Sequence, residues 1–131
     1  DGGAMAVGVD VLAGVLIAIS AFLLHEWGHL LGTFLTGGRV DYPSSWRTVF
    51  LFKFDEGNDR RQFLAMALGG FAASGMAIAA MALVFRFDSV TDWVATGLSV
   101  LGLLATVILE FPPAWRVLRG GAVPRDYVKI T

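Results

Sequence analysis

The sequence predicts an all-α membrane protein: one domain, residues 1–131, in which three transmembrane helices carry a short β-hairpin between the first and the second. Composition is the first observation behind this fold class. Hydrophobic residues make up 56% of the chain and charged residues only 16%, whereas soluble domains average about 25% charged residues. The second observation is a series of three long apolar stretches, and the third is a strand-like alternation in the connection after the first stretch.

Each of the three apolar stretches is suited to crossing a bilayer. Residues 11–35 are free of charge as far as Leu24, residues 63–85 carry no charged side chain, and residues 93–111 carry none before Glu110. A helix needs about 20 residues to cross a hydrocarbon core of about 30 Å, and these stretches approach or exceed that length. Three buried helices of a soluble bundle are the alternative, but such helices usually keep a polar face, and residues 63–85 have none.

Small residues in the second stretch predict that it is the central packing helix. Alanine, glycine and serine recur along it, and Gly70 and Ser74 form a small-xxx-small pair of the kind that lets helices approach closely in lipid. Gly28 in the first stretch costs about 1 kcal/mol of helix propensity relative to alanine, which the close approach of a second helix or of a substrate backbone would explain.

The connection between the first two stretches is expected to begin with a helix stop and to continue as a β-hairpin. Gly37 and Gly38 are typical of a helix C-terminus, and residues 43–45 form a turn cluster of proline and serine. Alternation of side chains up to Phe54 indicates that residues 40–54 form a short β-hairpin or strand beside the membrane. An amphipathic surface strand without a specific role is the alternative.

Basic residues predict the orientation. No lysine or arginine precedes Arg39, and nine of the ten basic residues lie either in the first connection or after residue 115. The positive-inside rule places that side in the cytoplasm, so the N-terminus is expected outside and the tail, residues 112–131, inside. We expect an integral protein of a bacterial inner membrane, with the lipid bilayer as its constant partner.

The only two histidines of the chain lie four residues apart in the first stretch, as His25-Glu26-Trp27-Gly28-His29. Residues i and i+4 share one face of a helix, so both imidazoles can bind one metal ion, and Glu26 can polarise a metal-bound water. This HExxH pattern is typical of zinc hydrolases. Because the chain has no cysteine, a metal site would use histidine, carboxylate and water, which suits zinc. Two satisfied polar residues in a helix interface are the alternative for the histidines.

Glu110 is the candidate third ligand. A carboxylate at membrane depth is costly and usually has a partner. Helix rise places His29 about 15 Å and Glu110 about 9 Å from the next arginine along the chain, depths similar enough for one metal to be shared. Two histidines, a carboxylate and water form a recognised catalytic zinc set. An interfacial carboxylate paired with Arg116 or Arg119 is the alternative, and Asp41 is the fallback ligand.

These features resemble the site-2-protease family of intramembrane zinc metalloproteases, and the resemblance covers nearly the whole chain as the three-helix catalytic core. In that family HExxH lies on the first core helix, a glycine turn and a membrane-associated hairpin follow, a small-residue helix comes next, and the third helix carries the last ligand. The family's last ligand is normally an aspartate followed by glycine, whereas here Glu110 has no following glycine. The resemblance implies zinc bound by His25, His29 and Glu110, with Glu26 as general base.

Two functions are consistent with these residues. The first is an intramembrane zinc metalloprotease that cleaves a transmembrane or membrane-proximal peptide, with Glu26 as the catalytic residue. The second is a non-catalytic small integral subunit of a larger membrane complex, in which the motif is a structural or relic metal site. A net charge of −1 gives no indication of nucleic-acid binding.

Overall fold

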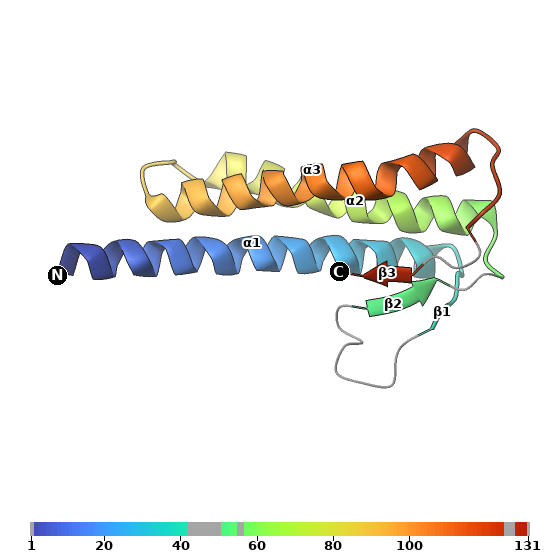
Figure 1. Cartoon of the computed structure of the whole chain (residues 1–131), viewed down its shortest axis with the longest axis horizontal. Coiled ribbons are helices and arrows are strands. Elements are labelled where there is room, and N and C mark those ends of the chain that lie inside the picture. The colour runs from blue at the N-terminus through green and yellow to red at the C-terminus, as the bar shows by residue number, and fades with distance from the viewer. Residues whose placement is uncertain (1, 42–50, 55–56, 125–127, 131) are drawn as a thin grey trace.

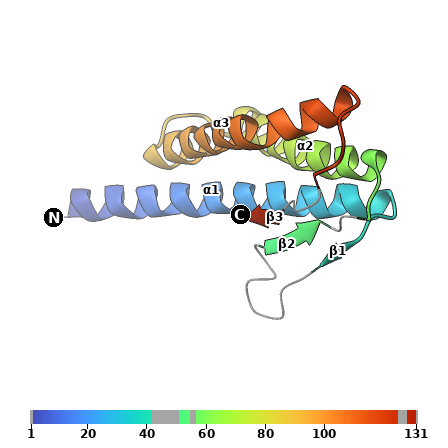
Figure 2. The same cartoon turned by 45° about the vertical axis from the view of Figure 1, so that its right-hand side comes forward.

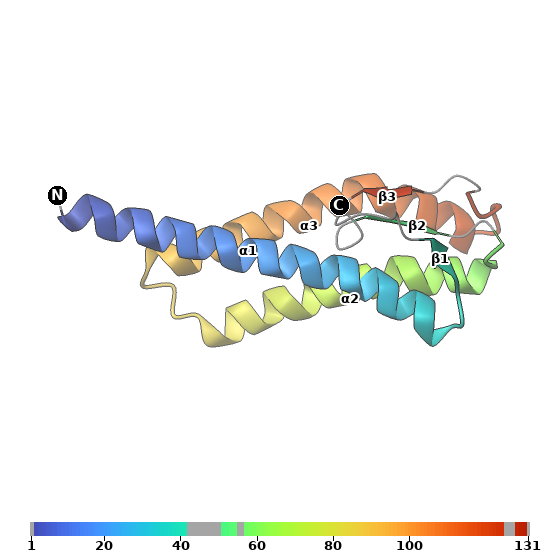
Figure 3. The same ribbon diagram turned by 90° about the horizontal axis from the view of Figure 1, so that it is seen from below.

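Three long helices form the body of the computed structural model, and a small sheet lies toward one end of it (Figure 1). The structure describes residues 2–41, 51–54, 57–124 and 128–130. Figure 3 shows α1 crossing over the other two helices, and α1 packs against both of them. The elements, in chain order, are α1 (Gly2–Leu35), β1 (Val40–Asp41), β2 (Leu51–Phe54), α2 (Arg60–Val84), α3 (Val90–Leu118) and β3 (Val128–Ile130).

All three helices are long and apolar enough to cross a membrane. Their 34, 25 and 29 residues correspond to about 51, 38 and 44 Å of helix, more than the roughly 30 Å of a hydrocarbon core. The predicted fold class is therefore confirmed at the level of three long apolar helices, which indicate an integral membrane protein. α1 begins at Gly2, close to Ala4, the earliest start that the sequence suggests for the first span, because no proline or polar turn interrupts the residues before Asp10.

The distribution of side chains is inverted relative to a soluble protein. The buried positions of α1 are small or polar, whereas its large apolar side chains face outward. An outer surface of this kind is suited to lipid, and small buried residues are what helix packing in a membrane requires. The exposed apolar side chains of α1 include Leu12, Leu16, Leu31 and Leu35.

Glycine lets α1 and α2 touch backbone to backbone. A Cβ atom on Gly28 would lie 2.4 Å from the carbonyl oxygen of Gly69, and one on Gly32 would lie 2.0 Å from that of Ala65. Real Cβ atoms essentially never approach other atoms within 3.0 Å, so neither position accepts a side chain without separating the helices. The close approach expected at Gly28 is confirmed, and the partner is α2.

Both ends of the first connection are fixed by local hydrogen bonds. Gly37 adopts a left-handed φ of 69°, and the N–H of Gly38 donates to the carbonyl of Thr33 at 2.8 Å. This is a Schellman motif, and it confirms the helix stop predicted at this glycine pair. α2 then begins with a capping box. The Asp59 carboxylate accepts from the N–H of Gln62, whose side-chain oxygen accepts from the N–H of Asp59, both at 2.8 Å.

α3 continues through Pro112 and Pro113, past residue 111, where the third span is predicted to end. Proline removes an N–H donor from the helix and disfavours its continuation. Here the turn after the prolines is held by packing, since Ala114 and Val117 are buried in the main apolar cluster of the bundle. Gly120, with a φ of 98°, then ends the helix in the same way as the glycine pair after α1.

The strands form one antiparallel sheet in the order β1-β2-β3, with Val40 opposite Phe54 and Leu51 opposite Ile130. Figures 1 and 2 both show this sheet beside the C-terminal half of α1. The hairpin predicted for residues 40–54 falls largely on residues 42–50, outside the described residues, so it stays a prediction. β3 was not expected, because three residues are too few to give a pattern in sequence.

Candidate metal centre

A polar stripe on α1 faces the interior of the bundle. His25, His29 and Thr33 follow one another at intervals of four and therefore lie on one helix face, and all three are buried. Glu26 is buried beside them, at 2% exposure. Polar side chains in an apolar helix avoid lipid by turning inward, which explains why this stripe rather than the leucines points at the neighbouring helices.

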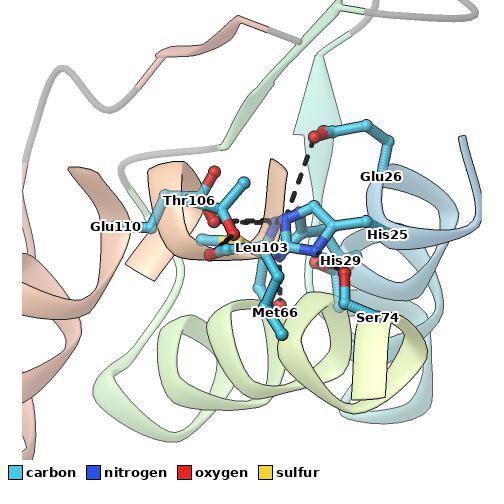
Figure 4. Close-up of polar contacts among 9 residues, drawn as sticks. His25, Glu26, His29, Met66, Ser74, Leu103, Thr106 and Glu110 are labelled. Atoms are coloured by element: carbon cyan, nitrogen blue, oxygen red, sulfur yellow. Dashed lines mark hydrogen bonds and ion pairs between the residues drawn. The ribbon is translucent and has the colours of Figure 1, made fainter. Parts of the chain in front are cut away.

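Glu110 reaches the two imidazoles from α3. Its Oε2 atom lies 3.3 Å from Nε2 of His25 and 3.2 Å from Nε2 of His29, and the two Nε2 atoms are 2.9 Å apart (Figure 4). The carboxylate is itself 8% exposed. The similar depth predicted for the HExxH motif and Glu110 is thus confirmed as direct proximity.

α2 holds the opposite side of both rings. Nδ1 of His29 is 2.7 Å from the carbonyl oxygen of Met66, and because a carbonyl only accepts, that nitrogen carries the hydrogen. Nδ1 of His25 is 2.7 Å from Oγ of Ser74. With both Nδ1 atoms engaged by α2, the Nε2 atoms converge on Glu110, which is the arrangement usual for metal-ligating histidines.

Gly70 makes room for the His29 ring between these two contacts. A Cβ atom at this position would lie 2.2 Å from Cε1 and 2.4 Å from Nε2 of His29. Met66, Gly70 and Ser74 follow one another at intervals of four, so one face of α2 serves both histidines. The sequence predicts helix packing for Gly70 and Ser74, with a substrate groove as the alternative, and does not indicate that they contact the histidines. The matching four-residue spacing of the histidines was the signal that could have found them.

The geometry fits a zinc ion. Tetrahedral zinc with bonds of about 2.0–2.1 Å separates its ligand atoms by about 3.3–3.4 Å. The three atoms here are 2.9, 3.2 and 3.3 Å apart. Lone pairs and a carboxylate oxygen at such distances repel one another in a buried site unless positive charge lies among them, so the donor set favours a cation or protons. With Glu26 included, the four possible ligand atoms lie within 4.8 Å of one another.

Glu26 is placed differently from the other three residues. Its Oε1 atom is 4.0 Å from Nε2 of His25, farther than any edge of the triangle formed by His25, His29 and Glu110. In Figure 4 its carboxylate extends away from α2, on the other side of the imidazoles from Ser74. The Glu26 carboxylate therefore lies beside this triangle rather than at one of its corners.

Two alternatives concern the third ligand: an ion pair between Glu110 and an arginine, and Asp41 in place of Glu110. The Arg119 guanidinium lies 5.7 Å from the centre of the Trp115 ring, while Glu110 faces the histidines. Asp41 lies in β1, and its side chain is outside the described part of the structure. Among the residues that the structure describes, Glu110 is the carboxylate outside the motif that lies at the histidine pair.

Comparison of the chain with protein-family models, with curated protein sequences and with solved structures gives no match. Fold and site together define the class: an integral membrane protein whose three candidate spans enclose a buried cluster of two histidines and two glutamates able to hold a metal ion. Zinc, peptide hydrolysis and the resemblance to site-2 proteases stay predictions.

Proposed function

We propose that this chain is an intramembrane zinc metalloprotease that hydrolyses a transmembrane or membrane-proximal peptide. The observation that carries the proposal is the convergence of His25, His29 and Glu110, with Glu26 beside them, in the buried centre of an apolar bundle. Four ionisable side chains at membrane depth are costly, and such residues usually mark a functional site. The resemblance of the motif order to the site-2-protease family supports the same function.

The chain's own residues suit this chemistry. When bound, zinc supplies a Lewis acid that polarises a carbonyl group and acidifies a coordinated water. His25 and His29 offer Nε2 because α2 engages their Nδ1 atoms, and Glu110 contributes the negative charge of the ligand set. Glu26, whose Oε1 lies 4.0 Å from Nε2 of His25, would hold the proton taken from the attacking water and would return it to the leaving amine.

The proposed substrate binds in extended form. A peptide bond inside a helix keeps its carbonyl bonded within the helix, so a transmembrane substrate must unwind before attack. In the sheet order β1-β2-β3 the central strand is already paired on both sides, which leaves the edges of β1 and β3 for strand addition. The hairpin predicted for residues 40–54 would present the β1 edge to the substrate.

The proposed orientation places the site in the inner half of a bacterial inner membrane. Arg39 follows α1, Arg60 begins α2 and Arg116 lies in the last turn of α3, so basic residues collect at one end of the bundle. His29 lies about 9 Å and Glu110 about 12 Å along their helices from that end. The positive-inside rule makes this end cytoplasmic.

The test separates metal binding from catalysis. The detergent-purified chain and its Glu26→Gln variant are assayed for bound zinc and for cleavage of a fluorogenic transmembrane peptide with helix-breaking residues in its inner half. Glu26→Gln should keep zinc and lose about 10²–10⁴-fold in rate, the usual contribution of a general base. Asp10→Asn is the matched control, since it removes a carboxylate from the same helix about 22 Å from His25.

Three outcomes contradict the proposal. If the wild-type chain holds no metal when it is purified without stripping, His25, His29 and Glu110 are not metal ligands. If the Glu26→Gln variant cleaves the peptide as fast as the wild type, Glu26 is not the general base. A third outcome favours the non-catalytic subunit: zinc is bound, no peptide is cleaved, and the chain co-purifies with a partner at fixed stoichiometry irrespective of Glu26.

A further inference from the structure

A small cavity lies among the three helices directly beside the metal-ligand cluster. Its volume is about 40 Å³, and it borders His25 on the side toward the N-terminus of α1, where Ala21 and Ala18 line it. The wall is largely apolar, but polar side chains from all three helices reach it. They are His25 from α1, Ser74 from α2, and Ser99 and Thr106 from α3.

Two serine hydroxyls at this cavity need partners. Ser99 is 9% exposed, and its Oγ has no hydrogen-bond partner among the described residues. Ser74 has one contact of this kind in the described part of the chain, with Nδ1 of His25. If His25 uses Nε2 for a metal, Nδ1 carries the hydrogen and Ser74 accepts it, so the hydrogen of the Ser74 hydroxyl must go to a different acceptor.

Thr106 supplies a further polar atom to the cavity. Its hydroxyl donates to the carbonyl of Leu103 at 2.8 Å, one turn back on α3, which leaves the lone pairs of Oγ1 able to accept. Figure 4 shows Thr106 and Ser74 on opposite sides of the His25 ring. The cavity is thus bordered by a hydrogen-bond donor at Ser74, an acceptor at Thr106, and the Ser99 hydroxyl, which can donate or accept.

We propose that this cavity is a water site, and that its water links Ser74 to Ser99 and holds His25 in the tautomer whose hydrogen is on Nδ1 and whose Nε2 lone pair faces the ligand cluster. A buried water occupies about 10–15 Å³ by this measure and takes two to four polar partners, so the cavity has room for about three molecules. The link to Nε2 rests on the proposed zinc site, whereas the water site itself does not.

The network acts as a positioning element for the first ligand. Without an acceptor in the cavity, Ser74 would turn its hydroxyl toward Nδ1 of His25 and donate to it. The ring hydrogen would then move to Nε2, which cannot bind a metal in that form. Water in the cavity removes this competition, because it accepts the Ser74 hydrogen and pairs the buried Ser99 hydroxyl at the same time.

The experiment uses the full chain in lipid nanodiscs with two readouts. X-ray hydroxyl-radical footprinting labels side chains beside bound water, here Phe22 and Leu103, and competition with a chromophoric chelator measures zinc affinity. Ser99→Val should abolish the labelling and weaken zinc binding about three- to tenfold, at or below the lower end of the range for partners of metal-ligating histidines. Ser99→Thr keeps the hydroxyl and should keep both signals.

Thr96→Val is the matched control, because Thr96 also has a buried hydroxyl without a partner in the described part of α3 but does not border the cavity. It should leave labelling and zinc affinity unchanged. If Ser99→Val does not fold, Ser99→Ala takes its place, with reduced rather than abolished labelling expected because Ser74 and Thr106 still border the cavity, and with the same loss of zinc affinity.

Absence of labelling in the wild type means a dry or lipid-filled cavity and overturns the water site. Labelling that disappears in Ser99→Val without a change in zinc affinity overturns the positioning role. A wild type that binds no zinc defeats the proposed function and, with it, the positioning role. In that case the labelling result still decides whether the cavity holds water.

Discussion

The His29 ring lies so close to α2 that one added methyl group at Gly70 should disable the cluster. A Cβ atom there would lie 2.2 Å from Cε1, 2.4 Å from Nε2 and 2.6 Å from Nδ1 of His29. Carbon contacts settle at about 3.5–4.0 Å, so in Gly70→Ala the ring must retreat by more than about 1 Å. Metal–ligand distances tolerate only about 0.2 Å, so His29 could not keep its place in the ligand set.

Zinc affinity in Gly70→Ala should therefore fall by at least about 10–100-fold, the loss usual when the support of a ligating histidine is removed. Overpacking should also lower the free energy of unfolding by about 1–3 kcal/mol, partly offset by the better helix propensity of alanine. Chelator competition and thermal unfolding of the detergent-solubilised chain measure the two effects.

Gly75→Ala provides the control on the same helix, because a Cβ atom at Gly75 meets nothing within 4 Å. That variant should bind zinc like the wild type and gain up to about 1 kcal/mol from helix propensity. The reasoning is refuted if Gly70→Ala keeps wild-type zinc affinity, or if both variants lose affinity to the same extent.

Three further predictions follow from the same contacts. Glu110→Asp withdraws the carboxylate by about 1.5 Å and should weaken zinc binding in the chelator assay, whereas unchanged affinity would argue against Glu110 as a ligand. Asp59→Ala removes the capping box of α2 and should cost about 1 kcal/mol in chemical denaturation with zinc affinity intact, and a loss of zinc binding would show that the helix start and the site are coupled. Removal of zinc should lower the free energy of unfolding of the wild type by about 2.7 kcal/mol if the free zinc concentration was 100-fold above Kd. The same loss is expected for Glu26→Gln, because Glu26 is not one of the three proposed ligands. An unchanged melting temperature after stripping would mean that no metal bridges the helices.

The positions of the helices were predictable because a membrane imposes length and apolarity on each span. The Schellman stop at Gly37 was predictable as well, since a glycine pair after an apolar helix has few other uses. The continuation of α3 beyond residue 111 is not predictable from sequence, because Pro112 and Pro113 disfavour a helix and the buried packing of Ala114 depends on tertiary contacts. The glycine pair that ends α3 carried the same signal as the pair that ends α1.

The sequence predicts which side chains form the candidate site but not the contacts that orient them. Helix rise and topology predicted that Glu110 lies at the depth of His29, because depth depends on residue counts alone. The contacts that orient the rings depend on how α2 is rotated, and one of them is the backbone carbonyl of Met66, which has no signature in sequence. The role of Ser74 likewise follows from its 2.7 Å contact with His25 rather than from its residue type.

The central claim is that side chains from α1 and α3 bind one zinc ion at the centre of the bundle. Zinc-edge X-ray absorption on the intact, unstripped protein tests it most directly, because the spectrum reports both occupancy and ligand type. The account predicts one zinc per chain, bound by nitrogen and oxygen at about 2.0–2.1 Å, with the scattering of two imidazoles. A protein without zinc, or a spectrum that lacks imidazole scattering, would contradict it.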